Sequence, residues 1–149
     1  MAAIRGKIRA ISVSEQKGTQ KVNVPEAELR ADFGIIGDAH SGNWHRQVSL
    51  LGAESINKMV EKGAQVGPGD FAENITTEGI DLLKLSVGSK LKLGQSVELE
   101  ITQFGKKCHS RCEILQQVGD CIMPREGVFA KVTRAGAISV GGVIEVIND

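Results

Sequence analysis

The chain has 149 residues, of which 41% are hydrophobic and 24% are charged, and its 18 basic side chains balance its 18 acidic ones. This composition is typical of a soluble globular domain, and the balanced charge excludes a long-range field that would favour nucleic acid or an anionic membrane. Four Phe, one Trp and no Tyr are too few rings for a surface on which single-stranded nucleic acid stacks. We therefore expect one domain over residues 1–149, without a nucleic-acid or membrane partner.

The cysteines and the apolar segments indicate in which cellular compartment the protein is found. No run of about 18 apolar residues occurs, as a membrane span would need, and residues 1–10 hold no apolar block of signal-peptide length. Three cysteines are an odd number and do not form a disulfide framework. The sequence therefore predicts a cytoplasmic protein with reduced thiols, each of which can be a nucleophile or a metal ligand.

The first half of the chain predicts short strands and one helix. Alternation of polar and apolar residues favours strands over residues 7–13 and 20–24, with a hairpin turn at 16–19. Residues 47–51 favour a further strand or the lead into a helix. Residues 53–62 predict that helix, because Ile56, Met59 and Val60 share one face. Residues 73–77 predict another short strand.

The second half predicts more strands. The segments 90–93 and 97–103 flank a turn, and strands are expected over 127–133 and 143–147, with a glycine-rich turn at 136–142. Residues 113–118 favour a short second helix. Some seven or eight short strands with one or two short helices predict a mostly β, barrel-like fold, and the helical content is too low for a doubly wound sheet.

The stretch KKCHSRCEI, residues 106–114, carries two cysteines, a histidine and three cations. Neighbouring cations lower the pKa of a thiol and favour the nucleophilic thiolate, and the same cations attract anions. A structural zinc site is the alternative, but it usually needs four Cys or His ligands and a second ligand pair is missing here. The third possibility is an ordinary solvated loop. Cys121 has no flanking cation and is interpreted as structural.

Two further stretches are unusual. FGIIGDAHSGNWHRQVSLL, residues 33–51, holds two of the three histidines, the only tryptophan and Arg46. Its glycines allow the backbone to approach a ligand or itself closely, and a long loop with a buried Trp is the alternative. In PGDFAEN, residues 68–74, Gly69 and Asp70 suit a turn, and Glu73 or Asn74 can anchor the loop.

Together these stretches resemble the MOSC domain, named for the C-terminal domain of molybdenum cofactor sulfurases. The resemblance covers roughly residues 5–147 and is strongest to the small stand-alone bacterial type. It is carried by five blocks in matching order: FGIIGDAHSGNWHRQVSLL, PGDFAENITTEGIDL, VGSKLKLG, LEITQFGKKCHSRCEI and GDCIMPREGVFAKV. The resemblance implies a mostly β, strongly bent barrel of the pyruvate-kinase-barrel-like kind, which agrees with the strand count.

The resemblance also implies a function. Such a domain binds molybdenum cofactor, or accepts sulfur as a cysteine persulfide from a pyridoxal-phosphate cysteine desulfurase and delivers it to molybdenum cofactor or another metal–sulfur centre. The implied partners are that desulfurase and molybdenum-cofactor enzymes, and 149 residues leave no room for a pyridoxal-phosphate domain. The alternatives are a molybdenum-dependent reductase of N-hydroxylated compounds and a non-enzymatic metal-binding module, so enzymatic activity stays open, as does the oligomeric state.

The implied site residues come from the same blocks. The Arg-Cys-x-Ile context identifies Cys112 as the active thiol and molybdenum ligand, whereas the distance from the ITQ segment, residues 101–103, favours Cys108, which we interpret as a second thiol. Asp38 and His40 are expected to orient their loop at the cofactor. Four cations are expected to hold the pterin phosphate or a persulfide: Arg46, Lys106, Arg111 and Arg125.

Overall fold

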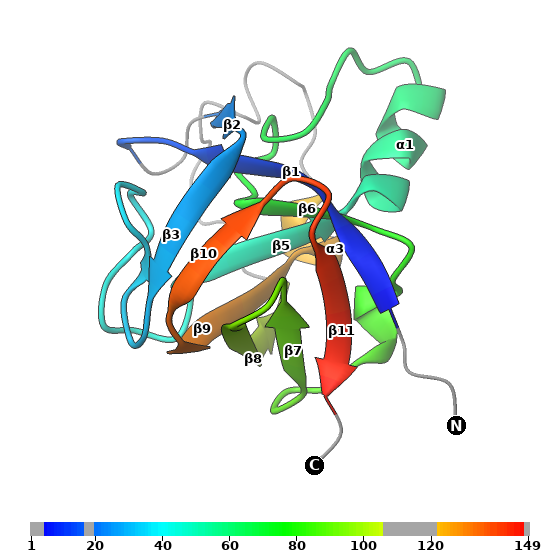
Figure 1. Cartoon of the computed structure of the whole chain (residues 1–149). Helices are drawn as coiled ribbons and strands as arrows, with labels where there is room; N and C mark the ends of the chain where they lie inside the picture. The colour runs from blue at the N-terminus through cyan, green and yellow to red at the C-terminus, as the bar shows by residue number, and fades with distance from the viewer. Residues whose placement is uncertain (1–4, 17–19, 106–121, 148–149) are drawn as a thin grey trace.

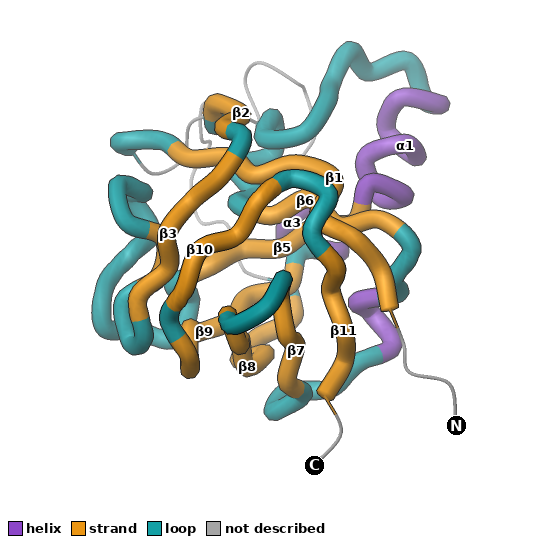
Figure 2. Tube along the Cα trace, viewed as in Figure 1, coloured by secondary structure: helices purple, strands orange, loops and turns teal. Residues whose placement is uncertain are grey.

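The computed structural model describes residues 5–16, 20–105 and 122–147 of the chain. Within these residues most of the structure is strand, and the helices are few and short (Figure 2). The helices are α1 (Ala53–Glu61), the 3₁₀ helix η1 (Leu82–Lys84) and α3 (Met123–Glu126). The strands are β1 (Arg5–Val13), β2 (Val22–Val24), β3 (Glu26–Arg30), β4 (Gly34–Ile35), β5 (Val48–Gly52), β6 (Ile75–Glu78), β7 (Lys90–Leu93), β8 (Val97–Phe104), β9 (Val128–Arg134), β10 (Gly136–Ser139) and β11 (Val143–Ile147).

Seven of the described strands close into a barrel. Their order is β11-β7-β8-β9-β5-β6-β1, and β1 pairs with β11 to complete the ring. The pairing of β5 with β6 is parallel, and the other pairings are antiparallel. A second sheet, β10-β3-β4, lies beside the barrel, with β3 and β10 next to each other in Figure 1. The structure therefore confirms the mostly β, barrel fold predicted from the sequence.

The barrel is bent because its long strands change partners and register. β1 pairs with β11 near Arg5, with β6 along its middle, and with β2 near Val13. Its register against β6 shifts between Ile8 and Ala10, and the register of β8 against β9 shifts twice. An extra residue in one strand bends that strand and increases its twist, so these irregularities let short strands close a strongly curved ring.

The barrel interior is filled by the inward side chains of alternate residues. Along β8 the odd-numbered residues Val97, Leu99 and Ile101 are fully buried, while the acidic residues between them are only half-buried. This is the alternation expected of a sheet with one face in the core. The largest cluster of buried apolar side chains draws on β1, β5, β7, β8, β9 and β11, so most strands of the barrel share one core.

A second apolar cluster lies under α1, which packs against β5 and β6 (Figure 1). Ile56 and Met59 of the helix are buried there with Phe71 and Phe129. Val60 was expected on the same face, but its side chain is 47% exposed. Ser55 takes the inward place instead, and its hydroxyl donates to the Glu126 carboxylate at 2.6 Å.

The loop before β6 is held by its own buried polar side chains, as the sequence predicted. The Glu73 carboxylate is fully buried and accepts backbone N–H bonds from Gly69 and Phe71 and a hydroxyl bond from Thr76. Burial raises the pKa of Glu73, and these donors oppose that rise. Asn74 accepts from the Ser49 backbone and joins the loop to β5. These hydrogen bonds therefore fix the loop in place between the strands.

The strand count exceeds the prediction, because β3, β4 and β10 were not expected. The segment of β3 is EAELR, whose residues favour helices over strands, and β4 has two residues, too few for a pattern. Residues 136–139 were predicted to belong to a turn, but they form β10, which pairs with β3. The predicted helix over 113–118 lies outside the described residues. None of the described helices is long and apolar enough to cross a membrane.

Candidate functional site

The loop that joins β4 to β5, residues 36–47, is anchored at both ends. Gly34 has φ +119°, and a Cβ atom at this position would lie 2.8 Å from the Gln47 carbonyl oxygen, so the close approach requires glycine. The buried Gln47 side chain accepts the Val132 N–H of β9 at 2.9 Å. The two ends of the loop therefore meet at the barrel wall.

Asp38 of this loop belongs to a buried polar cluster. Its Oδ1 atom accepts a 2.7 Å bond from the Lys21 Nζ and a 3.1 Å bond from the Ser14 backbone N–H. Its Oδ2 atom accepts the backbone N–H of His40 at 3.0 Å. The side chains of Lys21 and Asp38 are both fully buried. A buried charge is tolerated when it is paired and hydrogen-bonded, and this carboxylate is both.

The contacts of Asp38 decide its protonation state. Burial alone would raise its pKa, but the His40 side chain, whose Nδ1 lies 3.6 Å from the Asp38 Oδ2, and the hydrogen bond from Lys21 outweigh that effect, and the Lys21 charge adds to them. The pKa of the carboxyl is therefore held well below its ordinary value. Asp38 is an anion across the physiological range and matches the Lys21 ammonium.

Lys21 is a site residue that the sequence did not reveal. Alternation along residues 20–24 predicted that the valines face inward, but Val22 is 69% exposed and Lys21 is only 5% exposed. The side-chain period of a strand is two, so one inward lysine turns its neighbour outward. The distant partner Asp38 makes the inward position favourable for Lys21, and a local sequence pattern carries no information on that partner.

Arg46 lies among aromatic rings at the other end of the loop. Its guanidinium carbon is 4.7 Å from the centroid of the Trp44 ring and 5.6 Å from that of Phe129, distances at which a cation is attracted to a ring face. Within the described chain, the Arg46 Nε atom is buried and has no hydrogen-bond partner. Buried polar groups are normally paired, so this N–H is suited to an acceptor that the described residues do not supply.

The two parts of the loop are joined through Trp44. Its indole N–H donates to the His40 carbonyl at 2.7 Å, while its ring lies against the Arg46 guanidinium. The contacts therefore run from the buried Lys21–Asp38 pair through His40 to Trp44 and Arg46. Two of the predicted site residues of this loop, Asp38 and His40, are in direct contact, and Arg46 is connected to them by the tryptophan.

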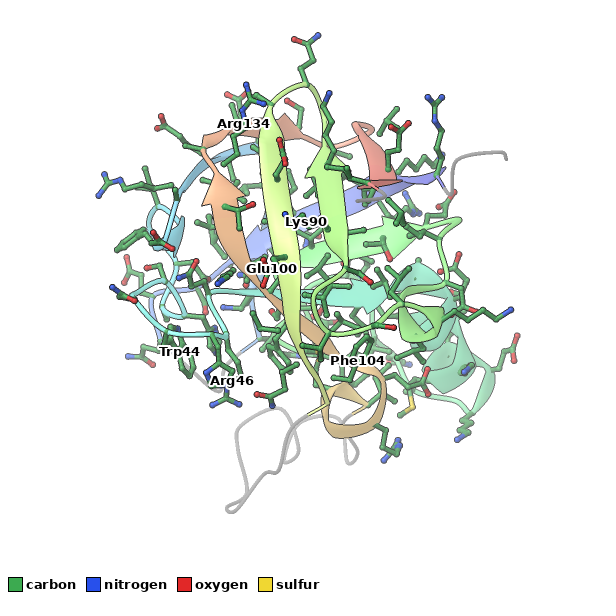
Figure 3. All side chains as sticks on the ribbon, turned by 90° about the horizontal axis from the view of Figure 1, so that it is seen from below. Trp44, Arg46, Lys90, Glu100, Phe104 and Arg134 are labelled. Atoms are coloured by element: carbon green, nitrogen blue, oxygen red, sulfur yellow. The ribbon has the colours of Figure 1, made fainter. Side chains whose placement is uncertain are left out.

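The Arg46 end of the loop lies against the C-terminal end of β8. The His45 Nε2 atom is hydrogen-bonded to the Gln103 Oε1 atom at 2.7 Å, and the Thr102 hydroxyl donates to the His45 carbonyl. Figure 3 shows Trp44 and Arg46 side by side at the end of the barrel where Phe104 terminates β8. Any ligand of Arg46 would therefore approach that end.

Arg125 reaches the same end of the barrel from a different element. It belongs to α3, is exposed, and precedes β9, whose first residue Val128 is paired with Phe104. The structure therefore brings the backbone segments of Arg46 and Arg125 to the end of β8.

Two cations on the outer barrel wall, Lys131 and Arg134, pair with acids of β8. Along β7, β8 and β9, basic and acidic residues alternate across the strands, and Figure 3 shows Lys90, Glu100 and Arg134 on this wall. Arg134 pairs with Glu98 at 3.3 Å and Lys131 with Glu100 at 3.9 Å. Exposed pairs of this kind contribute little to stability, but they engage both of these β9 cations with carboxylates of β8.

A cavity of about 380 Å³ lies between α1 and η1. Its polar lining includes Glu54, Lys58 and Glu126. Burial would raise the pKa of Glu126, but hydrogen bonds from Ser55 and Lys58 outweigh it and lower that pKa. None of the predicted site residues lines this cavity.

The predicted thiols lie outside the described residues. Cys108 and Cys112 fall in the segment 106–121, together with Lys106 and Arg111, so their roles stay predictions. Over residues 5–16, 20–105 and 122–147, no group of three or more His, Cys, Asp or Glu side chains could hold a metal ion. The described part of the site is therefore an arginine held by aromatic rings and a loop fixed by a buried ion pair.

Comparison with protein-family models matches residues 37–145 to the MOSC domain. This range begins just before Asp38 and includes Arg46, both thiols of the 106–114 stretch and Arg125. A search of curated proteins finds no match.

Several solved structures have a similar fold. The YUAD protein from Bacillus subtilis aligns with a TM-score of 0.81 and 21% identity, over 97% of each chain. YiiM from Geobacillus stearothermophilus aligns with a TM-score of 0.72 and 17% identity, over 96% of this chain and 75% of that one. YiiM from Escherichia coli gives 0.67 and 18%, over 96% and 70%. At these identities the likeness establishes the fold alone.

Proposed function

Because the chain belongs to the MOSC domain family, we propose that it acts at the molybdenum cofactor, binding it or carrying sulfur for it on a cysteine. The observation that carries this proposal is the family match over residues 37–145, which includes the Arg46 loop and both candidate thiols. Cys112 is the proposed active thiol, with Cys108 as the second thiol.

The described residues fit an anionic ligand. Arg46 offers a planar guanidinium whose orientation is set by Trp44 and Phe129, and its buried Nε lacks an acceptor among the described residues. Arginine binds phosphate through paired N–H donors in a fixed geometry. A pterin phosphate would supply the missing acceptor, and this supports Arg46 as a phosphate-binding residue.

The remaining cations extend this role. Arg125 is exposed at the same end of the barrel, and Lys106 and Arg111 flank the candidate thiols in the sequence. We assign these residues to the phosphate or to a persulfide, whose charge they would match. Asp38 and His40 act indirectly, by fixing the loop that carries Arg46.

The chemistry of the thiol follows from its setting in the sequence. Nearby cations favour the thiolate of Cys112, and a thiolate is a soft ligand suited to molybdenum. When bound, the cofactor supplies a molybdenum centre that accepts sulfur ligands. As a carrier, the Cys112 thiolate attacks the terminal sulfur of a donor persulfide; the donor sulfur–sulfur bond breaks, Cys112 becomes the persulfide, and the donor leaves as a thiolate.

Metal and pterin analysis tests the binding half of the proposal. The protein is purified from a host that makes molybdenum cofactor, and its molybdenum, pterin and zinc contents are measured beside those of Arg46→Ala. We expect molybdenum and pterin with the wild type and a clear loss of both with the variant. One zinc per chain without pterin would contradict cofactor binding and favour a simple metal-binding module.

A further inference from the structure

Strand β8 contains a bulge close to its C-terminal end. Ile101 is paired with Ala130 of β9, and Gln103 is paired with the preceding β9 residue, Phe129. Thr102 is therefore one extra residue in β8. In a regular strand successive side chains point to opposite faces, whereas a bulge changes the direction in which a side chain is aimed. The bulge therefore lets the neighbouring side chains of Thr102 and Gln103 reach the same residue.

That residue is His45, which precedes Arg46 in the loop between β4 and β5. The Thr102 hydroxyl donates to the His45 carbonyl. The Gln103 Oε1 atom is hydrogen-bonded to the His45 Nε2 atom, and the Gln103 Nε2 atom donates to the Gly105 carbonyl, both at 2.7 Å. Because the amide nitrogen of Gln103 donates to Gly105, its amide oxygen faces the imidazole. The bulge therefore holds residue 45 by both its backbone and its side chain.

The contacts of the bulge extend to both aromatic rings that face the Arg46 guanidinium. The Thr102 Oγ1 atom lies 3.2 Å from the carbonyl oxygen of Phe129, whose ring centroid is 5.6 Å from the guanidinium carbon. The His45 ring meets the Trp44 ring edge-on, at 71° and with 5.8 Å between the centroids. The Trp44 ring centroid is 4.7 Å from the same guanidinium carbon. The bulge is therefore linked to one ring directly and to the other through His45.

We propose that Thr102 and Gln103 are positioning residues that set the direction of the Arg46 guanidinium at the end of the barrel. Among the described residues the buried Nε–H of Arg46 has no acceptor, so the direction of this N–H decides which acceptor it meets. A hydrogen bond weakens steeply when donor and acceptor are misaligned. A displaced residue 45 would therefore weaken the binding of an oxyanion by Arg46 without removing any charge. This consequence for cofactor binding rests on the proposed function, whereas the positioning of Arg46 does not.

The Nε–H of Arg46 supplies a signal in protein without cofactor. In a proton–nitrogen correlation spectrum we expect one arginine Nε–H that the Trp44 and Phe129 rings shift away from the others and that exchanges slowly with water because it is buried. Arg46→Lys assigns the signal by its loss. In Thr102→Val, which keeps the shape of the side chain and removes the hydroxyl, the signal should move toward those of exposed arginines and exchange faster.

Two matched variants separate positioning from the loss of an ordinary strand contact. Thr102→Ser keeps the hydroxyl, so the Arg46 signal should stay at its wild-type position. Thr133→Val removes a hydroxyl that donates to the Glu98 carbonyl at 3.1 Å, at another register shift between β8 and β9, and should leave the signal unchanged. A wild-type Arg46 signal in folded Thr102→Val, or an equal change in Thr133→Val, would overturn the proposal.

Gln103→Leu supplies a second test that does not need Thr102→Val to fold. Leucine offers no oxygen to the His45 ring, so the Arg46 signal should move in the same direction as in Thr102→Val. An Arg46 signal at the wild-type position in Gln103→Leu would overturn the proposal, as would a wild type without a shifted, slowly exchanging Nε–H.

Molybdopterin retained by protein from a cofactor-making host is the last readout. We expect cofactor affinity to fall by roughly threefold to tenfold in Thr102→Val, the size of one ordinary hydrogen bond, and to stay near the wild-type value in Thr102→Ser and Thr133→Val. If the spectra of unloaded protein behave as expected but the wild type retains no molybdopterin, the proposed function fails and the positioning of Arg46 stands.

Discussion

Lys21 and Asp38 form an ion pair of 2.7 Å in which both side chains are fully buried. The pair joins the start of β2 to the loop between β4 and β5, two segments that share no strand pairing. The loop carries Trp44 and Arg46, so the orientation of the candidate anion site depends on a contact made deep inside the protein.

Removing one partner of the pair should be costly. Asp38→Asn would leave the Lys21 ammonium buried without its counter-charge, and breaking a buried pair in this way typically costs about 3–5 kcal/mol of unfolding free energy. Urea unfolding measures the change. The control is Asp81→Asn, because Asp81 is 58% exposed and lies 3.8 Å from Lys84; we expect a change below about 1 kcal/mol there. Equal effects of the two variants would contradict the account.

The same carboxyl predicts how stability depends on pH. The pKa of Asp38 is lower in the folded protein than its ordinary value of 3.8, so the folded state binds this proton less readily than the unfolded state. Its contribution to stability is complete above the unfolded pKa and is lost as the pH falls below about 4. We expect the unfolding temperature of Asp38→Asn to fall less steeply than that of the wild type as the pH is lowered from neutral. If the substitution leaves the loss of stability at low pH unchanged, that loss comes from other carboxyls.

Arg46→Lys tests the guanidinium. Lysine keeps the charge but loses the planar group against Trp44 and the buried Nε–H, so anion binding should weaken more than stability. A charge-assisted hydrogen bond contributes about 1.5–3 kcal/mol, so cofactor affinity should fall by roughly tenfold or more, while unfolding changes by about 1 kcal/mol. Retained molybdopterin after purification measures the first effect and urea unfolding the second.

The matched control for Arg46 is Arg134→Lys. Arg134 lies on the outer barrel wall and pairs with Glu98, so the lysine variant should retain the wild-type amount of molybdopterin. A similar loss of molybdopterin with both variants would mean that surface arginines in general matter, and not the Arg46 guanidinium held between Trp44 and Phe129.

Gly69→Ala tests how the loop before β6 supports Lys21. Gly69 has φ +91°, and a Cβ atom there would lie 2.8 Å from the Lys21 carbonyl oxygen and from the Ser12 hydroxyl. Backbone strain at a positive φ costs about 1–3 kcal/mol, and the close contacts add to it. Gly67→Ala is the control, because no atom lies within 4 Å of its added Cβ. A thermal shift no larger than that of the control would contradict the close packing.

Much of the fold was predictable because it follows from local alternation. The strands over residues 90–93 and 143–147 were predicted with the observed bounds, and the helix over 53–62 nearly so. β3 was missed, since its charged residues resemble those of a helix and it becomes a strand only by pairing with β10. A local sequence pattern carries no information on a pairing strand that lies far away in the chain.

The site was predictable only in part. The gathering of histidine, glycine, tryptophan and arginine drew attention to residues 33–51, and the resemblance to the MOSC domain then pointed to Asp38, His40 and Arg46. Neither gave Lys21 a role, because the alternation around it favours an outward side chain, and neither placed Phe129 beside Arg46. Both contacts join segments far apart in the chain, so they depend on the barrel topology.

The identity of the active thiol is the central claim, and sulfur transfer from a cysteine desulfurase given labelled cysteine tests it most directly. The account predicts label on the wild type and on Cys108→Ser, and none on Cys112→Ser, after the proteins are separated from the donor without reductant. Equal labelling of Cys112→Ser would contradict the choice of Cys112, and an unlabelled wild type would contradict the sulfur-carrier role.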